Sequence, residues 1–261
     1  MTEFESFAVE LAREAARVTL PFFRSDLRHE DKGGAAGFDP VTEADRQAEA
    51  AIRRLIAARY PDHGVIGEEY GEDRPDAEHV WVLDPIDGTR AFISGLPLWT
   101  TLIALRAEGR PSVGVIAQPY LDEIFLGGPN GARLLRGETE TPLAVRACAH
   151  LTDAVISTTD PDIFNGAERG AWTQVRAAAR LARLGCDAYA YAMVAAGKMD
   201  LVAEASLKSW DWSALVPVIE AAGGQVVNWR GDTPDDSGQI LAVGDPRLID
   251  QALVTLKRAA G

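Results

Sequence analysis

The spacing of apolar residues predicts helices in the first part of the chain. Apolar side chains recur every three or four residues from Phe4 to Val18, which is typical of an amphipathic helix. Thr2, followed three residues later by Glu5, forms a capping-box pattern and marks the start of this helix. Thr42 is expected to cap a second helix. Its inward face comprises Ala48, Ile52, Leu55 and Ile56.

The pattern then changes to short apolar runs separated by turn residues, which is typical of strands. Strands are expected at residues 65–67, 80–83, 98–105, 113–118 and 123–127, the last three as a meander. The glycine-rich segment 31–37 precedes them and predicts a mobile loop.

In the second half, strands and helices alternate. Strands are expected at residues 155–159, 201–204, 225–228 and 240–243. Helices are expected at residues 168–184, 187–196 and 211–222, with a last one ending at residue 259. This alternation favours a parallel or mixed α/β layer. We therefore predict an α+β half over residues 1–145 and an α/β half over residues 146–261.

Composition and charge narrow the class of protein. The chain has 261 residues, of which 47% are hydrophobic and 25% charged, as in ordinary globular proteins. Its net charge of −13 disfavours binding to nucleic acids or anionic membranes. There is no apolar run of ~20 residues and no signal-peptide pattern. Two cysteines, Cys148 and Cys186, favour a reducing compartment, so we expect a cytoplasmic protein.

The segment from Asp84 to Thr89 is the strongest chemical feature. Asp84 and Asp87 leave the end of a buried strand three positions apart. Gly88 permits close approach of the backbone, and Thr89 can begin a helix whose free N–H groups suit a phosphate. Carboxylate oxygens suit Mg²⁺. An ordinary Asp-Pro turn followed by a capped helix is the alternative.

Further acids accompany this motif. Glu68 and its neighbour Glu69 end a strand, Asp211 opens a helix, and Asp45 lies in the first turn of the second helix. Each has a structural alternative: a solvated loop, an N-cap, or a partner of the helix dipole. Together they favour a centre for several metal ions. The histidines are unclustered in sequence and we interpret them as surface or loop residues.

These motifs resemble the inositol monophosphatase family of Mg²⁺-dependent, lithium-sensitive phosphatases over nearly the whole chain. The matching segments are Glu68-Glu69, residues 84–89, residues 39–45, and Trp210-Asp211 with Ala214 and Gly223-Gly224. The resemblance implies a layered α-β-α-β-α sandwich of the sugar-phosphatase type. It also implies a homodimer and about two to three Mg²⁺ ions per active site.

The resemblance also implies roles for individual residues. Glu68, Asp84 and the Ile86 carbonyl would hold the first metal ion. Asp84, Asp87 and Asp211 would hold the second, and a third would lie near Glu68 through water. Glu68, Asp45 and Thr89 are the expected catalytic residues, Asp45 and Thr89 by orienting the attacking water. Gly88 and Thr89 would cradle the phosphate, and Lys32 matches the lysine of a mobile loop.

Three segments are similar to the histidinol-phosphatase branch of this family: residues 92–98, 185–191 and 223–229. Asp187 stands where inositol phosphatases usually have a small residue, and Glu204 matches the acid that contacts the substrate. We expect these two acids, with Arg183, to bind L-histidinol phosphate, which would be hydrolysed to L-histidinol in histidine biosynthesis. Alternatively, Asp187 caps a helix and Arg183 is a surface residue.

Other functions remain open from the sequence. Within the family, the substrate could be inositol-1-phosphate, a nucleotide 3′-phosphate or fructose bisphosphate. A haloacid-dehalogenase-type phosphatase would form an aspartyl phosphate, but its motif is Asp-x-Asp, whereas the spacing here is Asp-x-x-Asp. A binding protein without catalysis is disfavoured by the intact set of predicted ligands.

Overall fold

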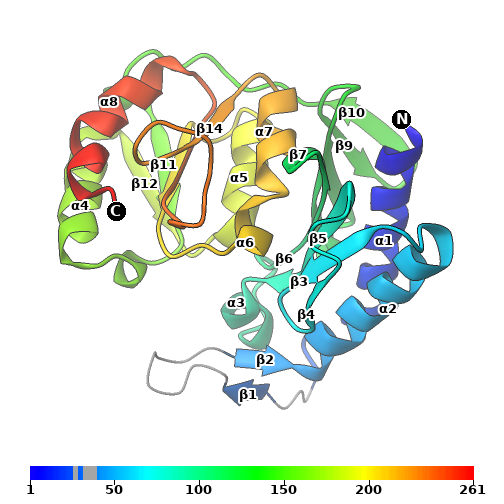
Figure 1. Ribbon diagram of the computed structural model, residues 1–261. Helices are drawn as coiled ribbons and strands as arrows, with labels where there is room; N and C mark the ends of the chain where they lie inside the picture. The colour runs from blue at the N-terminus through cyan, green and yellow to red at the C-terminus, as the bar shows by residue number, and fades with distance from the viewer. Residues whose placement is uncertain (26–28, 32–39) are drawn as a thin grey trace.

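The computed structural model describes residues 1–25, 29–31 and 40–261, and its helices and sheets form five layers (Figure 1). Helices α1 (Glu3–Thr19) and α2 (Glu43–Arg59) lie on one side of the first sheet. Helices α5 (Asp187–Ala195) and α7 (Leu215–Ala221) lie between the two sheets. Helices α4 (Gly166–Ala178) and α8 (Arg247–Leu256) cover the far side of the second. The predicted α-β-α-β-α sandwich is confirmed.

The first sheet has eight strands in the order β10-β9-β8-β7-β6-β5-β3-β4. Their bounds are β3 (Gly64–Gly67), β4 (Gly71–Asp73), β5 (His79–Asp87), β6 (Thr100–Ala107), β7 (Arg110–Gln118), β8 (Glu123–Gly127), β9 (Arg133–Arg136) and β10 (Thr139–Pro142). All neighbours are antiparallel except β3 and β5, which run parallel. The short hairpin β9–β10 was not predicted, because β9 has only two apolar residues, Leu134 and Leu135, and β10 is polar and exposed.

The second sheet has five strands in the order β12-β11-β13-β15-β14. Their bounds are β11 (Val155–Thr158), β12 (Leu181–Leu184), β13 (Leu201–Glu204), β14 (Gln225–Asn228) and β15 (Ile240–Val243). Strand β11 is parallel to both neighbours, and β15 is antiparallel to both of its own, so the sheet is mixed. A separate antiparallel pair, β1 (His29–Asp31) and β2 (Pro40–Thr42), lies next to helix α2 and the short helix α3 (Thr89–Ile93) (Figure 1).

Both predicted helix starts are confirmed by hydrogen bonds. The Glu5 N–H donates to Thr2 Oγ1 over 3.1 Å, and the Thr2 N–H donates to Glu5 Oε2 over 2.6 Å. Thr42 and Asp45 form the equivalent capping box at α2. The predicted glycine-rich loop, residues 31–37, lies outside the described residues apart from Asp31.

Two predicted helices were wrong in extent. The helix expected at 168–184 ends at Ala178, and residues 181–184 form the edge strand β12, because parallel pairing with β11 outweighs the local helical pattern. The helix expected at 211–222 is broken into α6 (Ser209–Trp212) and α7. Pro217 has no N–H for the Ser213 carbonyl, and its ring would collide with that carbonyl in a continuous helix.

Of the histidines interpreted as surface or loop residues, His63 lies in the loop before β3, whereas His79 is the first residue of strand β5. The rings of His63 and His79 stack with centroids 4.9 Å apart, and both are half-buried. His63 Nδ1 accepts a hydrogen bond from Trp81 Nε1 over 3.1 Å. They belong to an aromatic group that packs α1 against β5, a contact that sequence spacing does not show.

The central apolar cluster contains side chains from both halves of the chain, among them Ile116 of β7, Tyr191 of α5 and Val202 of β13. The division at residue 145 falls between the two sheets and stays a prediction, because the halves share this core. Within the described ranges, no helix combines the length and the apolarity needed to cross a bilayer.

Two paired glycines let α7 lie directly on the first sheet. Gly114 and Gly127 face each other across β7 and β8. A Cβ atom on Gly114 would lie 2.2 Å from the Ala214 carbonyl oxygen, and one on Gly127 would lie 2.2 Å from that of Pro217. Backbone atoms cannot yield to such contacts without moving the helix.

We expect Gly127→Ala to lower the free energy of unfolding by about 1–3 kcal/mol, because it forces α7 away from the sheet. Urea unfolding measures this change. Gly170→Ala is the control, since Gly170 is exposed on α4 and a Cβ there meets no atom within 4 Å. It should raise the free energy of unfolding by about 0.5–1 kcal/mol. Equal effects of the two substitutions would contradict the packing argument.

Candidate active site

The parallel pairing of β3 and β5 brings two of the predicted ligands side by side. Gly67 is paired with Leu83, so Glu68 and Asp84 are the next residues along two parallel neighbouring strands and lie side by side. The Glu68 N–H donates to the Leu83 carbonyl oxygen over 3.2 Å and continues the pairing by one residue. The negative charge of Glu68 contributes to the raised pKa of Asp84.

A bulge at the end of β5 places Asp84 and Asp87 together. Residues three apart in a regular strand point to opposite faces. Here Asp84 is opposite Leu102 and Asp87 is opposite Thr100, so β5 contains one residue more than β6 between these two positions. The extra residue returns Asp87 to the face of Asp84.

Helix α5 and strand β6 supply the partners of Asp87, and helix α6 supplies the third carboxylate. Asp87 Oδ2 accepts hydrogen bonds from the Ala188 N–H, over 2.8 Å in the first turn of α5, and from Thr100 Oγ1, over 3.3 Å. Asp211 lies in α6, where its Oδ2 accepts the Lys208 N–H over 2.6 Å. The alternative of Asp211 as an N-cap was wrong: Lys208 is the N-cap, and Asp211 sits three residues inside.

Asp84, Asp87 and Asp211 form a cluster that suits a cation. Each offers a carboxylate oxygen, and these oxygens lie within 4.8 Å of one another. Burial, and then the charges of neighbouring acids, raises the pKa of Asp84 and of Asp87 above its ordinary value and that of Asp211 to about 7. Three hard oxygen donors in one place, Asp84 buried and the other two half-buried, fit a divalent cation such as Mg²⁺ or Mn²⁺.

Glu68 and Ile86 border this cluster without belonging to the group of three. The charge of Glu68 also raises the pKa of Asp211, after the larger effect of burial, so Glu68 lies near both acids. The Ile86 carbonyl accepts a hydrogen bond from Thr89 Oγ1 over 3.1 Å, and its N–H donates to Asp84 Oδ1 over 3.0 Å. Their roles as metal ligands stay predictions.

Asp45 approaches the cluster from α2. Its Oδ2 accepts the Thr42 N–H over 2.8 Å and Thr42 Oγ1 over 2.5 Å, so it does serve the helix start. It is only 2% exposed, and burial is the main cause that raises its pKa to about 6. Its charge in turn contributes to the raised pKa of Asp84. The structural and the functional interpretation of Asp45 are therefore compatible.

Gly88 links the motif to Asp187. Its φ of +79° favours glycine, and Thr89 begins the short helix α3 (Thr89–Ile93), as predicted. A Cβ atom on Gly88 would lie 3.0 Å from Cγ of Asp187. Asp187 itself begins α5 with a φ of +44°, and Cys186 takes the N-cap position. The alternative of Asp187 as the helix N-cap was therefore wrong.

A pocket of about 210 Å³ opens beside the carboxylate cluster. Its lining includes Asp87, Asp187, Tyr191, Glu204 and Asp211. Buried Glu204 accepts the Thr159 N–H over 2.6 Å and Tyr191 Oη–H over 2.9 Å. Tyr191 was not predicted as a site residue, although it lies four residues after Asp187 on the same helical face.

Asp187 and Glu204 share this pocket, and predicted site residue Arg183 is not among the residues that line it. Burial, followed by the charge of Glu204, raises the pKa of Asp187 to about 7. Arg183 is exposed on the edge strand β12 and is absent from the pocket lining. Lys32 lies outside the described residues.

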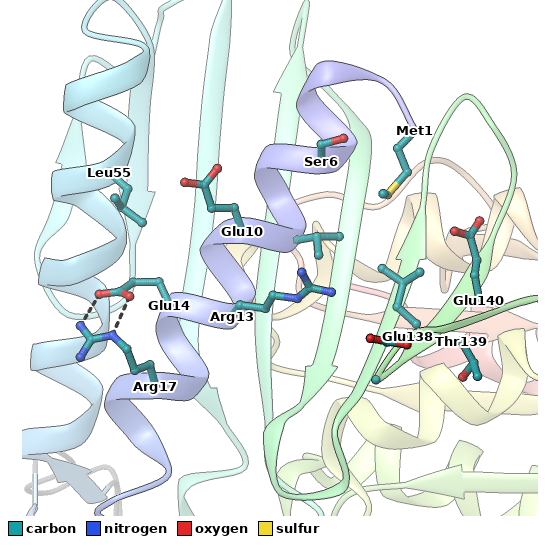
Figure 2. Close-up of a pocket in the computed structure, with 13 residues that line it drawn as sticks. Met1, Ser6, Glu10, Arg13, Glu14, Arg17, Leu55, Glu138, Thr139 and Glu140 are labelled. Carbon is teal, nitrogen blue, oxygen red and sulfur yellow. Dashed lines mark hydrogen bonds and ion pairs between the residues drawn. The ribbon is translucent and has the colours of Figure 1, made fainter.

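A larger hollow of about 810 Å³ lies on the outer face of α1, between α2 and the β9–β10 hairpin (Figure 2). Charged side chains dominate its rim, and Glu14 pairs there with Arg17 over 2.6 Å. None of the residues of the acidic motifs lines it. Size alone therefore does not locate the site, and the chemistry of the smaller pocket does.

Comparisons with known proteins agree with this geometry. A model described as the inositol monophosphatase family matches residues 1–259. The chain is 40% identical over 271 positions to the bifunctional phosphatase IMPL2, chloroplastic, of Arabidopsis thaliana, covering 98% of this chain and 76% of that protein. It is 36% identical over 233 positions to a histidinol-phosphatase of Chlorobaculum parvum, covering 88% of each. The solved inositol monophosphatase from Zymomonas mobilis superimposes with a TM-score of 0.88 at 38% identity, covering 98% of each chain.

The raised pKa values predict how the stability of the metal-free protein depends on pH. A carboxyl group whose pKa rises on folding makes the folded state bind more protons than the unfolded chain. Between about pH 4, the ordinary value, and about pH 7, the value for Asp187 and Asp211, the free energy of unfolding should therefore fall as pH rises. Urea unfolding in EDTA measures it.

Asp211→Asn is the control for this prediction, because it removes one of the titrating groups and should flatten the fall. Saturating Mg²⁺ should flatten it as well, since a bound cation favours the ionised carboxylates. The same pH dependence in the wild-type protein and in Asp211→Asn, both metal-free, would contradict the cluster's electrostatics.

Proposed function

Because this chain belongs to the inositol monophosphatase family, and is thus a metal-dependent phosphate monoester hydrolase, we propose that it is a Mg²⁺-dependent histidinol-phosphatase. The observation that carries the substrate is the second pair of acids, Asp187 and Glu204, in the pocket beside the cluster. The reaction would convert L-histidinol phosphate and water to L-histidinol and phosphate. Inositol-1-phosphate is the second candidate, favoured by the likeness to the Zymomonas mobilis protein.

Asp84, Asp87 and Asp211 would hold the cations, together with Glu68 and the Ile86 carbonyl, and two to three ions is our expectation. When bound, Mg²⁺ supplies the positive charge that attracts phosphate oxygens and makes water a better nucleophile. The protein has a formal charge of −13. Without the positive charge of the metal ions, its carboxylates would therefore repel a phosphate ester.

Thr89 and Asp45 are suited to orient the attacking water. The Thr89 hydroxyl donates its proton to the Ile86 carbonyl, so its oxygen lone pairs are left to accept a hydrogen bond from water. The Asp45 carboxylate accepts a hydrogen bond from the Thr42 hydroxyl, which fixes it as a second acceptor for the water. A water that donates to such fixed acceptors directs its own lone pair at phosphorus. The backbone N–H groups of Gly88 and Thr89 would receive the phosphate oxygens.

The second pair of acids suits a cationic substrate. Histidinol phosphate carries a protonated amine and an imidazole, whereas inositol phosphate offers neutral hydroxyl groups. Glu204 is already held by Tyr191 and Thr159. Asp187, by contrast, accepts no hydrogen bond from any residue that the structure describes, so its carboxylate is left for a ligand.

We further propose a lithium-sensitive, cytoplasmic homodimer, with Lys32 and Arg183 near the substrate. The two cysteines are free and buried, which suits a reducing compartment. Gel filtration, activity with LiCl, and the variants Lys32→Ala and Arg183→Ala each test one part of this proposal.

The first test of function is Asp87→Asn with Mg²⁺ and with EDTA. The substitution keeps the side-chain volume and removes a ligand charge, so phosphate release should fall at least ~100-fold. Stability should hardly change, because a buried negative charge is also removed. EDTA should abolish the wild-type activity and Mg²⁺ should restore it. Full activity after chelation, or a near-normal rate for Asp87→Asn, would contradict the proposal.

The substrate is tested with Asp187→Asn. Asparagine tolerates a positive φ as well as aspartate does, so the variant isolates the charge. We expect kcat/KM for histidinol phosphate to fall ~10–100-fold, and that for inositol-1-phosphate to stay equal or rise. Asp122→Asn is the control: Asp122 also has a positive φ, of +55°, and does not line the pocket. A parallel fall for both substrates would refute Asp187 as a specificity residue.

A further inference from the structure

The carboxylate of Glu49 is fully buried and has no part in the chemistry described above. We infer that Glu49 is a positioning residue for Glu68: it fixes the turn that carries Glu68 and thereby sets the affinity of the site for its divalent cation. This inference rests on the proposed role of Glu68 as a metal ligand.

Glu49 binds the two peptide groups that follow Glu68. Its Oε2 accepts the Glu69 N–H over 2.8 Å, and its Oε1 accepts the Tyr70 N–H over 3.2 Å. On the other side, the Glu68 N–H is held by the Leu83 carbonyl of β5. The backbone at Glu68 is therefore fixed by β5 and, one residue later, by α2.

The residue before Glu68 is in contact with the same carboxylate. A Cβ atom on Gly67 would lie 2.1 Å from Glu49 Oε1, closer than any real contact between such atoms. Glycine at this position lets the carboxylate lie directly against the backbone. The backbone positions of Gly67, Glu69 and Tyr70 therefore all depend on the Glu49 side chain.

Arg53 completes the arrangement. It lies one turn further along α2, and its Nε donates to Glu49 Oε1 over 2.8 Å. Its second terminal nitrogen donates to the Gly71 carbonyl at the end of the turn. The Glu49 carboxylate thus accepts three N–H groups at once, two from the backbone of the turn and one from Arg53. An amide at position 49 would turn an NH₂ group toward one of these donors and leave it unpaired.

Glu49 also couples Glu68 to the expected water-orienting residue. Asp45 and Glu49 are four residues apart on α2 and lie on the same face of the helix. One rigid helix therefore holds Asp45 beside Asp84 and, through the turn, holds Glu68 beside Asp84. A change in Glu49 shifts the turn while α2 and Asp45 stay in place.

The test compares wild-type protein, Glu49→Gln and the matched control Glu5→Gln. Glu5 is also fully buried on a helix, it accepts the Asn130 N–H, and a Cβ on Gly128 would lie 2.7 Å from it, but it belongs to the N-terminal end of α1. Mn²⁺ binding, measured by electron paramagnetic resonance, gives the affinity without turnover. Thermal unfolding gives the stability, and a Mg²⁺ titration separates half-saturation from kcat.

We expect Glu49→Gln to weaken Mn²⁺ binding and raise the half-saturating Mg²⁺ concentration ~10–100-fold, with kcat at saturating Mg²⁺ within about threefold of wild type. Glu5→Gln should lower the Tm and leave Mn²⁺ affinity unchanged. Unchanged Mn²⁺ affinity in Glu49→Gln, with a lower Tm like that of the control, overturns the positioning role.

Two further outcomes are decisive. Absence of Mn²⁺ binding in the wild-type protein would overturn the proposed function itself, which is distinct from a failure of Glu49 alone. If Glu49→Gln does not fold, Gly67→Ala takes its place, because the added methyl group displaces the same carboxylate. It should weaken Mn²⁺ binding in the same way, and wild-type affinity in a folded Gly67→Ala protein overturns the inference.

Discussion

The repulsion among buried carboxylates at the end of β5 is the constraint on which the rest of the site depends. Asp84, Asp87 and Asp211 converge within 4.8 Å, and burial and mutual charge raise the pKa of each. Such a cluster opposes folding unless protons or a cation compensate it. The fold tolerates it because each acid is tied to backbone N–H groups, and the family to which the chain belongs is metal-dependent.

Three devices of backbone geometry build this cluster and the adjoining pocket. Parallel pairing of β3 and β5 sets Glu68 beside Asp84, a bulge turns Asp87 to the same face, and the interrupted helix at Ser213 lets α6 present Asp211. The start of α5 then contributes an N–H to Asp87 and the carboxylate of Asp187 to the pocket. Under the proposed function, metal binding and substrate recognition would share one helix terminus.

Much of this arrangement could be predicted from the sequence, because its signals are local. The capping boxes at Thr2 and Thr42, the strand that leads into Asp84, and the helix that begins at Thr89 all follow from neighbouring residues. The motif around Asp84 also identifies the family, and the family resemblance predicts that Asp211 and Glu204 lie at the same site.

What could not be predicted depends on contacts between distant segments. Strand β12 forms only because β11 offers it a parallel partner, and the hydrogen bonds of Tyr191 and Thr159 to Glu204 require the folded pocket. In the sequence, Glu49 is not distinguished from the other polar residues of α2, because its contact with the turn after β3 exists only in the folded protein. The central claim is that the carboxylate cluster binds the catalytic cations. Anomalous scattering from crystals grown with Mn²⁺ tests it most directly. We predict peaks bonded to Asp84, Asp87 and Asp211, and Mn²⁺ found only elsewhere, with these three side chains unbound, would contradict this.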